Sequence, residues 1–296
     1  MFQGAAAIEE LVQLFEKRRM TLFHACQLVD FQTYLMLGGI PSRAHMERAS
    51  SLFTKLETDM QDHENSVWDK VFANLYDWGR VFTLGRAGVP NAYGPILLHF
   101  RPAALREASD VSITLHSAGG KGFNREQDSL CSIEEVNKLF QYSMDAEFNR
   151  NVIKFIDELR RDFPNAREVA VPEINCTVRS GRFSTKHLIR AEVDPYIIKG
   201  RSLYSLVDAI RKQTGASFEV RQRLCSVSVQ EKYNELASLI EITTPPLYSL
   251  CHNDNVSEEM RDWIEKLIQR GQEYQFRRYA KYLREGTLDP ILSKKH

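Results

Sequence analysis

The chain has 296 residues, of which 43% are hydrophobic and 26% charged, which suffices for a sizeable core and excludes a disordered chain. Lys plus Arg and Asp plus Glu both total 39, so the net charge is zero and no global positive field recruits nucleic acid. Any nucleic-acid partner must therefore be held by a local patch.

The five cysteines are widely spaced and odd in number, and no two of them form a Cys-x-x-Cys pair, which disfavours a zinc site and a disulfide framework. We therefore expect no metal and a reducing, cytoplasmic location. The opening MFQGAAAIEELVQLFEKRR has acidic residues where an export signal has basic ones, and no apolar stretch approaches the roughly 20 residues that span a bilayer. The sequence predicts a soluble protein without a membrane span.

Short elements of both kinds follow one another in the first half of the chain. The spacing of apolar residues and the positions of Gly and Pro predict, in order, a helix over Ala5–Arg18, a strand over Thr21–Cys26, a helix over Gln27–Leu37 closed by Gly38 and Gly39, a charged helix over Ser42–His63, strands over Gly94–Phe100 and Val111–His116, a glycine-rich loop over Ser117–Phe123 and a helix over Ile133–Phe140. The aromatic and glycine-punctuated stretch Trp68–Gly88 is expected to form a wall of the active site, and the glycine-rich loop to cover a ligand.

The second half mixes helices and strands without a regular βαβ alternation, which favours an α+β fold. Its predicted elements are helices over Glu147–Phe163 and Ser202–Gln213, strands over Asn165–Val171, His187–Val193 and Ser217–Arg221, and then helices over Gln230–Glu241, Ser257–Arg270 and Glu273–Arg284. A boundary near Ser226–Gln230 divides the chain into a catalytic domain of residues 1–228 and a helical extension of residues 229–296 packed on it.

Two residues stand out as candidates for chemistry. His24 ends an apolar strand just before a helix, where a neutral imidazole could hydrogen-bond a ribose hydroxyl, although a partly buried structural His is the alternative. Glu168 puts one carboxylate into the apolar run NAREVAV. A carboxylate there could stabilise an oxocarbenium-like state while nicotinamide leaves NAD and could accept the proton of the nucleophile. The alternative is an exposed Glu that protects an edge strand.

Other side chains could hold the two substrates. Arg43, directly after Ser42, could pair with a pyrophosphate in bidentate fashion, or be a solvated Arg at a helix start. Tyr93 could stack on the nicotinamide ring, or bridge core and solvent. A basic cluster could guide a nucleic-acid strand by phosphate contacts and base stacking on Phe183, or be an ordinary solvated hairpin; it comprises Arg179, Arg182, Lys186, His187 and Arg190.

With these residues in place, the chain resembles the ADP-ribosyltransferase fold and, within it, the DarT-like toxins that modify nucleic acid. LFHACQLVDFQTYLMLGGIPSR is similar to the family's opening order of strand, His, helix, Gly and Ser-Arg, and NAREVAV resembles the strand that supplies its catalytic Glu. GVPNAYGPILLHF is loosely similar to the central strand region. The family's central Arg has three candidates here, Arg80, Arg86 and Arg101, and the helical region after Val229 has no counterpart.

The resemblance implies a split β-sheet with flanking helices, NAD as the donor substrate, His24 on the ribose and Glu168 as the catalytic carboxylate. It also implies a base in RNA or single-stranded DNA as acceptor, and a toxin restrained by an antitoxin protein and serving antiviral defence. The same scaffold could instead modify a protein side chain, which the balanced charge favours, or hydrolyse NAD. A non-enzymatic interaction module whose helices bind another protein is the alternative of another class.

Overall fold

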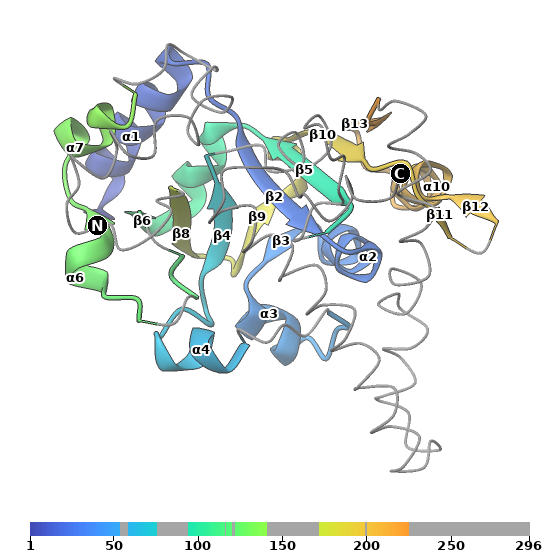
Figure 1. The fold of residues 1–296 in the computed structure, drawn as a ribbon, viewed down its shortest axis with the longest axis horizontal. Helices are drawn as coiled ribbons and strands as arrows, with labels where there is room; N and C mark the ends of the chain where they lie inside the picture. Colours follow the sequence, from blue (N-terminus) through green and yellow to red (C-terminus); the bar gives the residue numbers. More distant parts are fainter. Residues whose placement is uncertain are drawn as a thin grey trace, which may run out of the picture.

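The computed structural model describes residues 1–53, 59–75, 94–115, 117–119, 122–140, 172–198 and 200–224, and a mixed β-sheet forms its centre (Figure 1). In the order in which they lie side by side, the strands are β1 (Phe2–Gln3), β6 (Ala108–Thr114), β8 (Glu173–Val178), β4 (Val71–Asn74), β2 (Leu22–Cys26), β5 (Ile96–Phe100), β10 (Leu188–Val193) and β13 (Glu219–Gln222), with β7 (Ser129–Leu130) paired to β6. Neighbours run antiparallel except β10 and β13, which are parallel. This sheet with its flanking helices confirms the predicted α+β class.

The two halves of the sheet meet at a narrow junction between β2 and β4. These strands are joined by one residue pair, Phe23 with Asn74, whereas β2 pairs with β5 over five residues and β4 with β8 over four. All five residues of β5 are buried, as expected for a strand in the middle of a sheet. The junction therefore lies one strand away from the fully buried β5 and is itself held by one backbone residue pair.

Helices lie at both ends of the row of strands and also below it in the view of Figure 1. At one end lie α1 (Ala5–Lys17), α6 (Arg125–Asp128) and α7 (Ile133–Lys138), and at the other lie α10 (Leu203–Gln213) and the hairpin of β11 (Ile197–Ile198) and β12 (Arg201–Ser202). The helix α1 buries Leu11, Val12 and Phe15 and packs on the 3-10 helix η1 (Pro102–Glu107). Its apolar stripe is the one that the sequence periodicity predicts.

The segment after β2 turns sharply twice. The helix α2 (Leu28–Leu37) ends at Gly38, which adopts the left-handed conformation with φ 73° that glycine tolerates at a helix end. Next, β3 (Gly39–Pro41) pairs with β9 (Arg182–Ser184), which is followed by the 3-10 helix η3 (Thr185–His187). Pro41 pairs with Arg182, so the chain that leads to Ser42 lies beside a hairpin about 140 residues later in the sequence.

Most predicted elements within the described residues are confirmed to within a few residues. These are α1, β2, α2, β5, β6, α7, β10, α10 and β13. The single helix predicted over Ser42–His63 is wrong: α3 (Arg43–Arg48) ends at Ala49, Ser50 takes a left-handed φ of 50°, and α4 (Asp59–Glu64) begins separately. A serine in that conformation cannot continue a right-handed helix.

Eight of the described strands were not predicted, namely β1, β3, β4, β7, β8, β9, β11 and β12. All of them except β4 and β8 have only two or three residues, too few to show a periodicity. The predicted helix Glu147–Phe163, the strand Asn165–Val171 and everything after residue 224 lie outside the described residues, so the division at residue 228 stays a prediction. No helix within the described residues is long and apolar enough to cross a membrane.

Candidate active site

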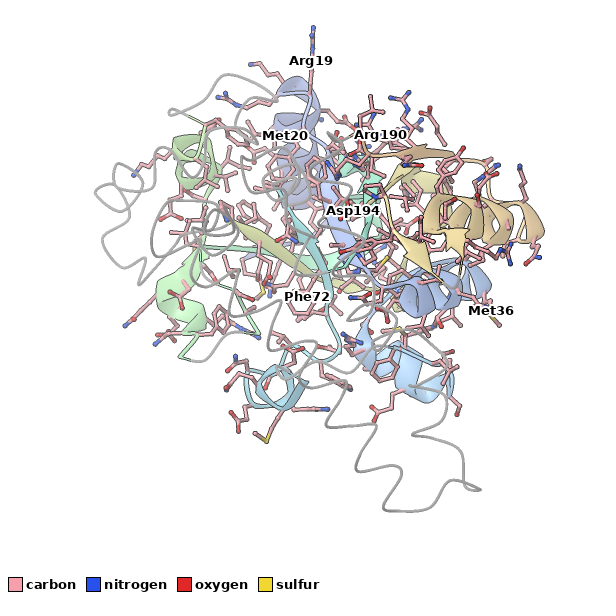
Figure 2. The ribbon with its side chains drawn as sticks, turned by 45° about the vertical axis from the view of Figure 1, so that its right-hand side comes forward. Arg19, Met20, Met36, Phe72, Arg190 and Asp194 are labelled. Atoms are coloured by element: carbon pink, nitrogen blue, oxygen red, sulfur yellow. The ribbon has the colours of Figure 1, made fainter. Side chains whose placement is uncertain are left out.

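His24 is held at the junction of the two half-sheets by both ring nitrogens. Its Nδ1 lies 2.8 Å from the carbonyl oxygen of Phe72 on β4, and its Nε2 lies 3.1 Å from the hydroxyl of Tyr34 on α2; Phe72 is labelled in Figure 2. A carbonyl only accepts, so Nδ1 carries the proton, and in the neutral ring Nε2 then accepts from Tyr34. Burial, the largest effect, lowers the pKa of His24, which keeps the ring neutral at pH 7.

This arrangement qualifies the predicted role of His24. The imidazole is neutral, as the sequence argument requires, but both of its nitrogens already have partners within the protein. A ribose hydroxyl that bound this ring would have to take the place of the Tyr34 hydroxyl at Nε2. Binding of a sugar here is therefore an exchange of one hydroxyl for another rather than the filling of a vacant site.

Arg43 lies close enough to His24 for its charge to act on the ring, and Ser42 directly precedes it in the chain. The positive charge of Arg43 lowers the pKa values of both His24 and Tyr34, although burial dominates each shift. The guanidinium lies 5.1 Å from the centre of the Phe53 ring. Ser42 is buried and caps α3, because its hydroxyl accepts the backbone N–H of His45 at 3.2 Å. The structure thus brings His24, Tyr34 and Arg43 together, with Ser42 in a capping position.

Buried Asp30 supplies a negative charge to the same place. It lies in the first turn of α2, where its carboxylate accepts the backbone N–H of Gln27 at 3.3 Å and completes a capping box. Its charge acts on the pKa of His24, Tyr34 and Cys26, raising each of them. A cation and a carboxylate therefore flank the His24–Tyr34 pair, and both come from the segment that the sequence singled out.

Two of the predicted site residues, Glu168 and Tyr93, lie outside the described residues, as do Arg80 and Arg86. Their roles stay predictions. Arg101 is described: it precedes η1 at the end of β5, where it is exposed and its backbone N–H donates to the carbonyl of His187 at 3.0 Å.

The structure reveals a carboxylate that the sequence argument missed, Glu173 at the start of β8. Its Oε1 accepts the backbone N–H of Ala118 at 2.9 Å, and its Oε2 accepts the hydroxyl of Ser117 at 3.3 Å. Desolvation, opposed by these bonds and assisted by the charge of Asp62, raises the pKa of Glu173 to about 7. The side chain is partly exposed, so it combines access with a strongly shifted pKa, as acid–base residues often do.

The sheet register relates Glu173 to His24. Phe23 pairs with Asn74, and Asn74 pairs with Glu173, so two strand spacings, about 10 Å, separate the backbones of β2 and β8 at this level. Paired residues share a face and successive ones alternate, so the His24 side chain starts on the face opposite to Glu173. The two side chains therefore start on opposite faces of the sheet, and a ligand that touched both would have to reach from one face to the other at the junction.

A signal for Glu173 was present in the sequence. Pro172 is followed by EINCTV, in which one carboxylate opens an otherwise strand-like run, the same reasoning that singled out Glu168 five residues earlier. The choice between the two needs the partners of the carboxylate. Those partners, Ser117 and Ala118, come from the glycine-rich loop that was expected to cover a ligand.

The predicted basic cluster is only partly available to a nucleic acid. Phe183 is 1% exposed and packs on Phe100 with ring centres 5.9 Å apart, so the expected stacking of a base on it is wrong. Lys186 forms an ion pair of 2.8 Å with Glu107, and Arg190 one of 3.3 Å with Glu192. Arg179 and Arg182 remain candidates for phosphate contacts, next to Ser42, whose backbone N–H donates to Gly181 at 3.0 Å.

A second charged cluster is structural. Arg223 is 7% exposed and bonds Glu192 at 3.0 Å through Nη2 and Asp194 at 3.2 Å through Nε, which ties β10 to the end of β13. Figure 2 labels Arg190 and Asp194 in this region. His99 on β5 lies 3.8 Å from Glu192, and burial followed by nearby arginines lowers its pKa to about 2. Within the described part of the chain, no group of three or more His, Cys, Asp or Glu residues could hold a metal ion.

No protein-family model matches the chain, and no curated protein matches it significantly. Among solved structures it is similar to Thermosipho africanus DarTG in complex with ADP-ribose, with a TM-score of 0.38 and 12% sequence identity. The similarity covers 71% of this chain and 51% of that chain, so the match extends over about half of the latter.

Proposed function

We propose that this protein is an NAD-dependent mono-ADP-ribosyltransferase that transfers ADP-ribose to a base in RNA or single-stranded DNA. The observation that carries the proposal is the convergence of His24, Tyr34 and Arg43 at a sheet junction, with Glu173 two strands away. The segment with this order of residues is the one that resembles the DarT-like toxins. We further propose a toxin role in antiviral defence, with an antitoxin protein as partner.

The reaction breaks the glycosidic bond between ribose C1′ and the nicotinamide nitrogen, and the bonding electrons leave with nicotinamide. A carboxylate beside the sugar stabilises the positive charge that develops on the ribose. The acceptor nitrogen or oxygen forms the new bond to C1′, and its proton passes to a base. Arg43, close to His24, is suited to the pyrophosphate because a guanidinium binds phosphate oxygens in bidentate fashion. Tyr93 is proposed to contact the nicotinamide.

Two residues compete for the role of the carboxylate. Glu168 is the residue proposed from sequence, and Glu173 is favoured by its pKa near 7 and its partial exposure. A pKa near the working pH suits a group that accepts a proton in one step and releases it in another. The substitutions Glu168→Gln and Glu173→Gln keep shape and remove charge, so they separate the two candidates.

A nucleic-acid acceptor is supported by the position of the hairpin around β9. Arg179 and Arg182 flank Gly181, which is hydrogen-bonded to Ser42, so cations that could bind phosphates lie directly beside the Ser42–Arg43 segment. Because Phe183 is buried, these contacts would be to the backbone of the nucleic acid and would position it without reading its sequence.

The test is incubation of the full chain with NAD labelled in its adenosine part, together with RNA, single-stranded DNA or protein extract. Label in a nucleic acid, lost with one Glu→Gln variant, supports the proposal. Label in protein alone, or nicotinamide release without any labelled acceptor, overturns the nucleic-acid acceptor and supports the protein-modifying or hydrolytic alternative. No nicotinamide release under any condition overturns the enzyme and leaves the interaction module.

A further inference from the structure

Ala118 links Glu173 to the end of α4 through its two backbone groups. Its N–H donates to Glu173 Oε1 at 2.9 Å, and its carbonyl accepts Asn65 Nδ2 at 2.8 Å. Ala118 is fully buried, and the neighbouring Ser117 donates a second bond to Glu173 Oε2 at 3.3 Å. The carboxylate is therefore bound by two donors of one loop, and that loop is anchored from the other side.

Gly119 fixes the same loop against Asp62 of α4. A Cβ atom added at Gly119 would overlap Asp62 Oδ1, so no larger residue fits unless one of the two moves. The φ angle of Gly119 is not positive, so the close approach, and not backbone conformation, is the reason for a glycine here. Asp62 is 8% exposed, and its carbonyl accepts the backbone N–H of Val67 at 2.9 Å, which closes the turn after α4.

We propose that Asp62, Asn65 and Ser117–Gly119 form a clamp that holds the Glu173 carboxylate in the orientation in which it acts in ADP-ribose transfer. This inference rests on the proposed function, with Glu173 as the working carboxylate. The members of the clamp are positioning residues, since they touch Glu173 or the loop that binds it. Enzymes depend on such support because a displacement of about 1 Å at a reacting group can reduce the rate roughly 100-fold.

The charge of Asp62 gives the clamp a second effect. The strands beside Glu173 present Asn74 and Thr114, the loop presents Ser117, and α4 presents Asp62, so the charged group that faces Glu173 from these described elements is Asp62. Desolvation raises the pKa of Glu173, the bonds from Ala118 and Ser117 lower it, and the Asp62 charge raises it further. Removing that charge should lower the pKa of Glu173.

The first test needs no activity. In full-length protein labelled with carbon-13 at the Glu carboxyl groups, the Glu173 resonance is assigned with Glu173→Gln and titrated by NMR. We expect a midpoint near pH 7 in the wild type, and a lower midpoint in Asp62→Asn. Asp208→Asn on α10, a carboxylate paired with Arg211 and Lys212, is the matched control and should not move the Glu173 midpoint. A midpoint that is the same in wild type and Asp62→Asn overturns the electrostatic part of the clamp.

The second test uses the transfer reaction. Asn65→Ala and Gly119→Ala should each lower kcat about 10- to 100-fold while the KM for NAD changes little, because the carboxylate is misplaced and the binding contacts remain. Asn137→Ala is the control for Asn65. Asn137 lies on α7 and accepts a hydrogen bond from Arg18, so its replacement should leave kcat unchanged. Adding Asp62→Ala to Gly119→Ala removes the overlap and should restore part of kcat.

The outcomes separate the two proposals. If folded Asn65→Ala and Gly119→Ala retain wild-type kcat, or if the double variant recovers nothing, the clamp is wrong even though transfer occurs. An acidic limb of the kcat/KM profile that moves to lower pH in Asp62→Asn supports the clamp, and a limb that stays in place contradicts it. A wild type with no activity overturns the proposed function, and the NMR titration still decides whether Asp62 acts on Glu173.

Discussion

His24 and Phe72 connect the two half-sheets, because the imidazole Nδ1–H donates to the backbone carbonyl of Phe72 at 2.8 Å where β2 and β4 share a single residue pair. The His24 side chain thus helps to hold together two strands that backbone hydrogen bonds hold together elsewhere in the sheet. The same ring accepts from Tyr34 on α2, so it also fixes the helix that leads to Arg43.

Replacing His24 with Ala should lower the free energy of unfolding by about 2–3 kcal/mol, because two bonds are lost and the Phe72 carbonyl loses its partner. Tyr34→Phe removes one of the two bonds and should cost about 1 kcal/mol. Urea unfolding at pH 7.5 measures both. Equal losses for the two variants would show that the bond to Phe72 contributes nothing.

Glu173 should make stability depend on pH in a defined direction. Its pKa in the folded protein, about 7, exceeds its ordinary value of 4.5, so the folded state holds the proton more tightly than the unfolded state. The contribution of Glu173 to the free energy of unfolding is fully present below pH 4.5 and is lost as the pH rises to about 7. At pH 8, Glu173→Gln should therefore be more stable than wild type by about 1–2 kcal/mol. This difference is smaller than the full pKa shift implies, because the side chain is partly exposed and solvent screens its charge. Thermal unfolding at pH 5 and pH 8 measures the difference, which should shrink at the lower pH.

His99 should make stability depend on pH in the opposite direction, with a loss of stability as the pH falls. Its pKa falls from 6.5 to about 2 on folding, so its contribution is present above pH 6.5 and is lost progressively as the pH falls toward 2. The expected slope is about 1.4 kcal/mol per pH unit below pH 6. His99→Phe keeps a ring against Phe23 and removes the titration, so urea unfolding between pH 6.5 and 4.5 should give a shallower slope for this variant. Parallel slopes for the two proteins would refute this account.

Arg223 should stabilise the end of the sheet formed by β10 and β13. It is almost fully buried between Glu192 and Asp194, and Arg223→Ala removes the cation that these two carboxylates share, although Glu192 keeps its ion pair with Arg190. Breaking a buried pair in this way typically costs about 3–5 kcal/mol. Arg221→Ala is the control, because Arg221 is exposed and its ion pair is with exposed Glu219. Denaturant unfolding should show a loss below about 1 kcal/mol for that variant, and similar losses for both arginines would contradict the assignment.

Gly39 should tolerate no side chain. A Cβ at this position would overlap the carbonyl of Phe183 across the β3–β9 pair, and backbone cannot move as a flexible side chain can. Gly39→Ala should destabilise the protein by about 1–3 kcal/mol and displace the adjacent Ser42–Arg43 segment. Gly215→Ala, at a position with open space, should cost about 1 kcal/mol from its left-handed φ of 68° alone. A calorimetric melting curve for each variant measures the difference.

The α+β class and the segment Thr21–Arg43 could be read from the sequence, because periodic apolar residues and helix-ending glycines are local signals. The strand β2, the helix α2 and the turn at Gly38 follow from them. A two-residue strand such as β1 carries too few residues for a period. A left-handed Ser50 leaves no mark in composition, so the break between α3 and α4 was not predictable.

The amino-acid sequence alone singled out side chains as candidates for chemistry: an imidazole at a strand end, a guanidinium after a glycine turn, and one carboxylate in an apolar run. Only the tertiary structure decided what surrounds them. His24 has both nitrogens occupied, Phe183 is buried, and Glu173 is bound by a loop more than 50 residues away in sequence. The physical reason is that burial, hydrogen-bond partners and the pKa shifts they cause depend on contacts between distant segments, which no local pattern specifies.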